Sequence, residues 1–222
     1  MLTGHPLAPV SPHDAEYEGI KDNIGKPEWK PDYGPQSFVP SWGCTAVGAR
    51  MFLIAYNINL LGTKEQANRI AFNVREKGRG PDKPGRFKNV AGIGWYVDEY
   101  NMAQISVYCT DFTKVNIHTV FESCKSDAID MNLAVAGSEL VGLVPLECML
   151  DIAKYYIEKE VSKLTPPPPL SHSLLHSLTT SKPTTILSPQ NLFIVDERQM
   201  VSLAIDRLGL NSVSRFDPNE RI

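Results

Sequence analysis

The loop from Gly34 to Gly43 holds the residue types of this chain that are best suited to binding a flat ligand. Prolines stiffen the loop, and glycines let its backbone approach a ligand closely. Phe38 and Trp42 offer flat apolar faces, while Ser37 and Ser41 add short polar groups. This composition predicts a cradle for a planar heterocycle. The residues leave one alternative open, a Pro/Gly-rich connector in which Trp42 caps the core.

The segments around this loop give the pattern its specificity. FVPSWG at 38–43 is followed by GAR at 48–50 and FLIAYNINL at 52–60, with KEQA at 64–67 and GIGWY at 92–96. In this order they resemble the formiminotransferase family (glutamate formimidoyltransferases), whose members move a formimino group from formiminoglutamate to tetrahydrofolate in histidine breakdown. The resemblance runs from about residue 15 to residue 222, with one interruption near the C-terminus.

This resemblance implies a folate-binding role for the loop, with tetrahydrofolate as the substrate. In the family, the matching segment lies between two subdomains. The residues that the resemblance assigns to folate binding are Gly34, Pro35, Gln36, Ser37, Phe38, Val39, Pro40, Ser41, Trp42 and Gly43.

The catalytic histidine of the family has no counterpart in the sequence. The family carries it in an N-terminal subdomain, in a Gly-Glu-His-Pro-Arg-Met-Gly setting. His5 stands between Gly4 and Pro6, but Leu7 follows where the family has arginine, so we interpret His5 as a chance match. We therefore expect no catalytic residue here, a chain that starts near the end of that subdomain, and little formimino transfer by the chain alone.

Two alternatives to an inactive folate-binding subdomain stay open. One is a noncatalytic interaction module or half-site partner of a formiminotransferase, which pairs with itself as a homodimer or with the missing N-terminal subdomain. The other is a partial gene model of a complete enzyme.

A second candidate site is the basic segment 75–88. This segment contains six basic side chains and only two acidic ones, Glu76 and Asp82, and it is rich in glycine and proline. An anion clamp at Arg79, Lys83 and Arg86 would suit the glutamate tail of a folate. A solvated surface loop with cations near a helix C-terminus is the alternative.

The other histidines offer little catalysis. His118 is expected in the first turn of a helix, as a surface residue rather than an acid–base catalyst. His13 falls in the irregular head of the chain, and His172 and His176 fall in an atypical insert.

Hydrophobic periodicity predicts the elements that position these sites. Alternation indicates strands at 52–60, 90–98, 102–110 and 133–139, of which the second and third are expected to form a short hairpin. Apolar stripes indicate helices at 63–77, 117–132 and from Pro145 onward. Thr63 and Gln66 have capping-box spacing, and Gly78 is expected to end the first helix. Asp196 and Gln199 are expected to cap a last helix, ended by Gly209, that docks back on the same core. Asn57 and Asn59 either face solvent or line the folate cleft.

This order predicts an α+β fold, a ferredoxin-like βαββαβ unit with helices on one face of an antiparallel sheet, plus C-terminal helices. The expected organisation is an irregular head and folate-loop segment at 1–48, the C-terminal subdomain at 49–160, a disordered Pro/Ser/Thr-rich insert at 161–190, and a completing helix at 191–222.

Composition excludes several other classes. The net charge of -3 gives no pull toward nucleic acid or an anionic membrane. The scattered cysteines, Cys44, Cys109, Cys124 and Cys148, indicate neither a zinc site nor a disulfide framework. No secretory signal or apolar run of membrane-spanning length is visible, so we expect a cytoplasmic protein without metal.

Overall fold

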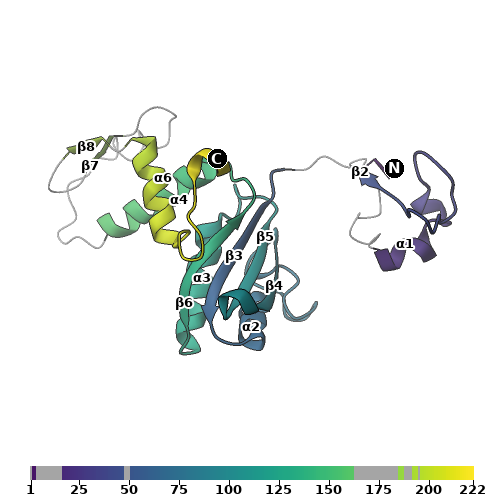
Figure 1. The fold of residues 1–222 in the computed structure, drawn as a ribbon, viewed down its shortest axis with the longest axis horizontal. Helices are drawn as coiled ribbons and strands as arrows, with labels where there is room; N and C mark the ends of the chain where they lie inside the picture. Colours follow the sequence, from purple (N-terminus) through teal and green to yellow (C-terminus); the bar gives the residue numbers. More distant parts are fainter. Residues whose placement is uncertain (1, 4–16, 48–50, 163–184, 188–191, 195) are drawn as a thin grey trace. The chain divides into compact units, whose positions relative to one another are not determined.

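The computed structural model describes residues 2–3, 17–47, 51–162, 185–187, 192–194 and 196–222. It divides the chain into two compact units, Met1–Met51 and Phe52–Ile222 (Figure 1).

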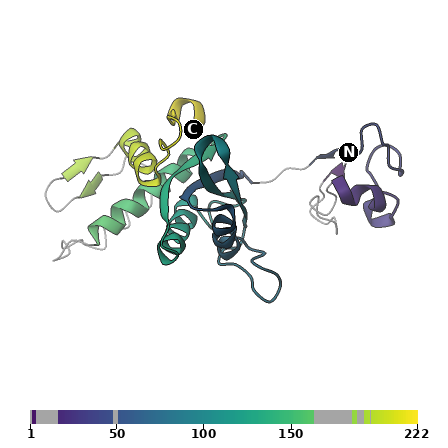
Figure 2. The same cartoon turned by 60° about the horizontal axis from the view of Figure 1, so that its bottom comes forward.

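The larger unit is built on a four-stranded antiparallel sheet. Its strands are β3 (Ile54–Leu61), β4 (Val90–Val97), β5 (Met102–Cys109) and β6 (Ala134–Val141), arranged in the order β4-β5-β3-β6. Helices α2 (Lys64–Val74) and α3 (Ile117–Asp130) lie together on one face of the sheet (Figure 2). The chain order strand, helix, strand, strand, helix, strand confirms the predicted α+β fold with its βαββαβ unit.

The core lies between the sheet and these helices. Alternate residues of β3, from Ile54 to Leu60, are fully buried on the helix-facing side. They meet the stripe of α2 at Ala67, Ile70, Ala71 and Val74, all fully buried. Each fully buried valine, leucine or isoleucine of this set contributes about 2 kcal/mol to the stability of the fold.

The predicted capping box of α2 is confirmed. The Thr63 hydroxyl accepts a hydrogen bond from the Gln66 backbone N–H at 3.3 Å, and the Thr63 N–H donates to the Gln66 side chain at 2.8 Å. The predicted end of the helix at Gly78 is wrong, because α2 stops at Val74 and Arg75 is extended. The chain leaves the helix early because the following loop bonds back to it, with Phe87 N–H donating to the Val74 carbonyl at 3.2 Å.

Strands β4 and β5 form the predicted short hairpin. They are joined by a single 3-10 turn, η3 (Asp98–Tyr100), after which Asn101 adopts a left-handed conformation with φ 50. Asparagine tolerates that conformation better than most residues, so the tight connection carries little strain.

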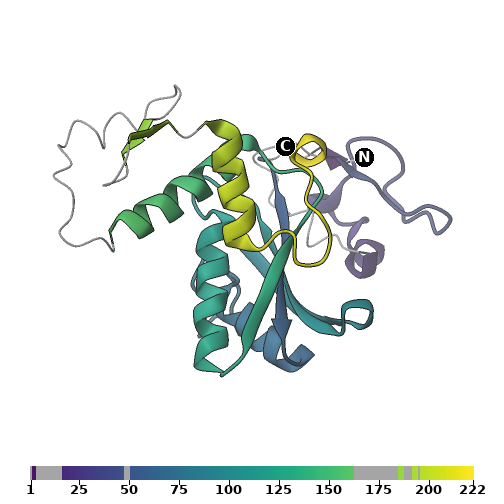
Figure 3. The same ribbon diagram turned by 60° about the vertical axis from the view of Figure 1, so that its left-hand side comes forward.

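Two further helices, α4 (Leu146–Val161) and α6 (Glu197–Leu208), pack against each other (Figure 3). Asp196 and Gln199 form the predicted capping box of α6, and Gly209 ends the helix at φ 64. The predicted docking of this helix is confirmed, since Leu208 joins the main core and the Gly209 carbonyl accepts a hydrogen bond from Ser138 N–H at 3.0 Å. A last short helix, α7 (Pro218–Arg221), follows.

Most of the predicted insert, 163–184 and 188–190, lies outside the described residues. At its end, strand β7 (Thr185–Leu187) pairs antiparallel with β8 (Leu192–Ile194).

The smaller unit has little regular structure. It contains α1 (Tyr17–Asn23), a 3-10 turn η2 (Pro27–Trp29), and the strands β1 (Leu2–Thr3) and β2 (Ala46–Val47), which pair in parallel. Its core is small and consists of Ile20, Ile24 and Trp29, against which Phe38 and Cys44 pack.

Candidate functional site

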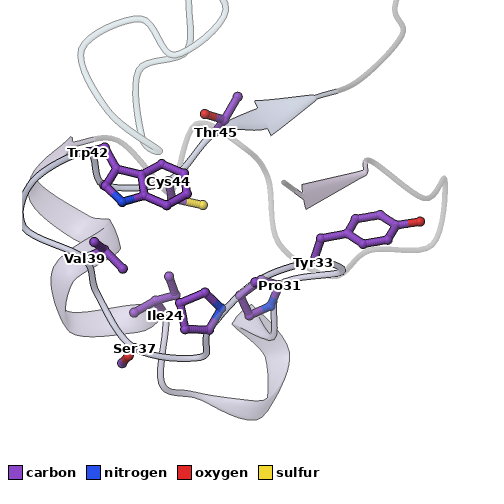
Figure 4. Close-up of a pocket in the computed structure, with 11 residues that line it drawn as sticks. Ile24, Pro31, Tyr33, Ser37, Val39, Trp42, Cys44 and Thr45 are labelled. Carbon is purple, nitrogen blue, oxygen red and sulfur yellow. The ribbon is translucent and has the colours of Figure 1, made fainter.

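The predicted ligand loop lines a pocket in the smaller unit. The pocket has a volume of about 550 Å³, within the range of small-molecule sites. Figure 4 shows the indole of Trp42 beside Cys44 on one side, with Ile24 and Pro31 opposite. Trp42 is 71% exposed, so its ring can contact a ligand and is not buried in the core.

A tight turn positions Trp42. The N–H groups of Trp42 and Gly43 both donate to the Val39 carbonyl, at 3.3 and 2.7 Å. Gly43 closes the turn with φ 63, a conformation that favours glycine. The turn lifts the indole away from the small core, which is the arrangement that a stacking platform needs.

The structure divides the predicted folate residues into two groups. Those that line the pocket are Gly34, Pro35, Ser37, Val39, Trp42 and Gly43. Gln36, Phe38, Pro40 and Ser41 are not among its lining residues. Phe38 was expected to offer an exposed face, but it is half-buried, because it packs against the small core of Ile20, Ile24 and Trp29.

Sequence reasoning missed the rest of the lining, which comprises Ile24, Pro31, Tyr33, Cys44 and Thr45. Ile24 follows Ile20 at the four-residue spacing of a helical stripe, a signal that could have marked it as a buried wall. Pro31 and Tyr33 precede the loop directly, so extending the predicted segment toward the N-terminus would have included them.

The basic segment 75–88 holds a second pocket together with α2. Arg79 and Lys83 line it, but Arg86 does not. The Arg86 guanidinium instead makes two hydrogen bonds to the Asp127 carboxylate, at 2.6 and 2.9 Å, and one to Ser123 at 2.9 Å. Asp127 raises the pKa of Arg86, so this cation is committed to α3.

Asn57 and Asn59 of β3 are both buried, so their amides do not face solvent. Asn59 is fully buried; its oxygen accepts a hydrogen bond from Gln104 at 2.8 Å, and its nitrogen donates to Ser212 at 3.3 Å. Gln104 in turn accepts from the Trp95 indole at 2.9 Å. This polar row lies on the sheet face opposite α2 and α3.

Around that row, the same sheet face exposes large apolar side chains. Ile93 and Trp95 of β4, Tyr108 of β5 and Val141 of β6 are each about half exposed. Contiguous apolar exposure of this kind is typical of an interaction surface.

His118 lies in the first turn of α3, as predicted, but it is half-buried rather than at the surface. Its ring stacks on Tyr155 with 4.4 Å between centroids, and its Nδ1 has no hydrogen-bond partner among the described residues. Burial lowers the pKa of His118 to about 4, against the opposing effect of the Asp151 and Glu122 carboxylates. His5, His13, His172 and His176 lie outside the described residues.

The cysteines are all free thiols. Three of them, Cys109, Cys124 and Cys148, are buried as expected, and Cys44 is half-buried at the pocket. Burial raises the pKa of Cys109 and of Cys148 to about 12, which keeps these thiols protonated and unreactive. In the described part of the chain, no three His, Cys, Asp or Glu side chains gather as they would around a metal ion.

Comparison with known proteins identifies the family of this chain. Residues 55–166 and 176–222 match the formiminotransferase domain, and residues 5–50 match the N-terminal subdomain of that domain. The segment between the two matched stretches falls within the predicted insert. The chain belongs to the formiminotransferase family.

Named relatives agree with this assignment. The chain is 52% identical over 207 residues to the formimidoyltransferase-cyclodeaminase of Dictyostelium discoideum, covering 93% of this chain and 33% of that protein. It is 48% identical over the same length to the enzyme of that name from Mus musculus, with the same coverage. It is 36% identical over 153 residues to the glutamate formimidoyltransferase of Thermoplasma acidophilum, covering 68% of this chain and 48% of that protein. The chain thus spans about a third of the length of the bifunctional relatives.

None of the helices that the structure describes has the length and apolar character of a membrane span.

Proposed function

We propose that the pocket around Trp42 binds the pterin ring of tetrahydrofolate, and that the chain supplies this wall of a formiminotransferase site. The exposed indole of Trp42 at the rim of the pocket carries the proposal. A pterin is flat and aromatic, and stacking on such a ring is worth about 1 kcal/mol beyond the area it buries.

The polar edges of the pterin would meet the few polar groups of the lining. Ser37 and Thr45 offer hydroxyls, which can both donate and accept, and Tyr33 offers a phenol. The remaining walls are apolar, from Ile24, Pro31 and Val39, and would exclude water from the ring faces.

No histidine is among the described residues that line this pocket. In formimino transfer the folate nitrogen attacks the amidine-like carbon and loses a proton, and the departing glutamate nitrogen gains one, a task suited to a histidine that titrates near neutral pH. The one histidine among the described residues, His118, belongs to the larger unit and has a pKa of about 4. We therefore assign the 222-residue chain a binding role and expect it to transfer formimino groups poorly by itself.

Fluorescence titration tests the binding role. Tetrahydrofolate added to the purified chain should quench the Trp42 emission in a saturable manner, and this signal should vanish in Trp42→Phe. A turnover assay with formiminoglutamate and tetrahydrofolate tests the second part, and turnover near that of an intact formiminotransferase would contradict it.

The exposed sheet face favours a second candidate function, a noncatalytic interaction module. Ile93, Trp95 and Tyr108 would be covered by a second copy of this chain or by the N-terminal subdomain of a formiminotransferase. Sedimentation velocity of the chain alone, and of the chain mixed with an N-terminal subdomain, tests this candidate function. A mass that increases with concentration, or a complex with the added subdomain, supports it. A chain that stays monomeric in both experiments contradicts it.

We place this function in the cytosol. The free thiols support that location, because cysteines stay reduced there. Fractionation of cells that express the tagged chain would test it, and recovery in a secretory compartment would contradict it.

A further inference from the structure

A second cavity, separate from the Trp42 pocket, lies between α2 and the basic loop 75–88. It has a volume of about 670 Å³ and lies wholly within the larger unit. Its lining residues are Glu65, Asn68, Arg69, Phe72, Asn73, Arg79 and Lys83. Three cations therefore face one carboxylate, on a protein whose overall charge is -3.

The Arg79 guanidinium is held in place over the helix. It donates one hydrogen bond to the Asn73 side-chain oxygen at 2.8 Å and one to the Arg69 carbonyl at 3.1 Å. It also lies 5.9 Å from the centre of the Phe72 ring. Neither bond uses a charged acceptor, and a guanidinium has further N–H donors, so Arg79 keeps its positive charge and part of its donor capacity for a ligand.

The loop that carries Arg79 and Lys83 is folded tightly. Arg79 N–H donates to the Lys83 carbonyl at 2.9 Å, and Lys83 N–H donates to the Gly80 carbonyl at 3.0 Å. Gly78 has φ 52, and a Cβ at this position would collide with the Lys83 carbonyl oxygen. These constraints keep the backbone of Lys83 beside that of Arg79, which lowers the entropic cost of using both cations on one ligand.

The charges of this cavity are not neutralised internally. Within the described residues, Arg69 and Lys83 form no ion pair, whereas Arg86 in the same loop is paired with Asp127. Glu65 is the opposing group; it stands one helical turn before Arg69 and is exposed, so solvent weakens its effect.

We propose that this cavity binds a small multivalent oxyanion, a di- or tricarboxylate or a phosphate ester. Arg79 supplies directed N–H donors, Lys83 and Arg69 supply further positive charge, and Phe72 gives the floor an apolar surface. The proposal does not depend on folate binding, because no residue of the Trp42 pocket takes part.

Calorimetric titration of the 222-residue chain with citrate, a tricarboxylate, and separately with glycerol 3-phosphate, a phosphate ester, tests this inference. Both probes are multivalent oxyanions, but one carries carboxylates and the other a phosphate. The probe with the lower dissociation constant identifies the ligand class. The test variant is Arg79→Gln with Lys83→Gln. The control is Lys77→Gln with Lys88→Gln, which removes the same charge from the same loop outside the cavity lining.

We expect the test variant to weaken binding about tenfold or more and the control to change it less than about twofold. NMR signals of the Arg79 side-chain Nε–H and the Phe72 amide should shift on titration of the unaltered chain. Equal weakening in both variants would overturn the proposal in favour of a diffuse positive field. Absence of binding by both probes at low salt would overturn it as well. Circular dichroism confirms that each variant is folded.

Discussion

Arg86 and Asp127 form a two-pronged ion pair that ties the basic loop to α3. Asp127 is almost completely buried, and Asn73 of α2 adds a third hydrogen bond to the same carboxylate at 2.7 Å. One side chain on α3 therefore joins α2, the loop and α3.

Replacing this carboxylate should cost stability. We expect Asp127→Ala to lower the free energy of unfolding by about 2 kcal/mol, because it leaves the Arg86 and Asn73 donors without their acceptor. Chemical denaturation measures the change. Asp130→Ala is the matched control: Asp130 is exposed at the C-terminal end of the same helix, where a negative charge is unfavourable, so its removal should be neutral or slightly stabilising. Equal losses in the two variants would contradict the role given to Asp127.

The capping box at the start of α2 gives a second prediction. Thr63→Ala removes the acceptor for Gln66 N–H and should lower the free energy of unfolding by about 1 kcal/mol. Thr119→Ala, at an exposed position inside α3, should have no such cost, since alanine is the better helix former there. If thermal unfolding shows the Thr63 variant to be as stable as the unaltered chain, the cap does not hold the helix start.

His118 should make the larger unit sensitive to acid. Its pKa is about 4 in the folded state against 6.5 as the ordinary value, so the unfolded chain takes up the proton first. The contribution of the neutral His118 ring to the free energy of unfolding is therefore fully present above pH 6.5. It is lost as the pH falls toward 4, which lowers the free energy of unfolding by about 2 kcal/mol.

His118→Phe isolates this effect, since phenylalanine keeps a ring against Tyr155 but cannot be protonated. Urea unfolding midpoints measured between pH 7 and pH 4 should fall less steeply for the variant than for the unaltered chain. Parallel pH profiles would show that other groups, such as the Glu122 carboxylate, account for the acid sensitivity.

The sequence predicts best the parts of the fold that local chemistry determines. The β3 alternation and the capping boxes at Thr63 and Asp196 depend on neighbouring residues alone, and the structure has them as predicted. The end of α2 does not follow from local signals, because the loop returns from Phe87 to bond the helix at Val74. Gly78 does adopt the left-handed conformation that its residue type suggests, but it lies in the loop after α2 and not at the end of the helix.

The polar row on the sheet escaped prediction for the same reason. Asn59 can be buried because Ser212, which lies 153 residues away in the chain, and Gln104 satisfy its amide. The residues near Asn59 in the sequence do not indicate that these distant side chains would bond to its amide. The candidate pocket falls between these cases: Trp42 could be found from the loop composition, whereas Ile24 joins it through packing across the small unit.

Tetrahydrofolate binding to matched tryptophan variants tests the central claim most directly. Isothermal titration should show binding by the unaltered chain and by Trp95→Ala, whose tryptophan lies on the sheet of the other unit. Trp42→Ala should bind about tenfold more weakly, because it removes the stacking face of the pocket. Identical affinities for Trp42→Ala and the unaltered chain, or no binding by any of them, would contradict the claim.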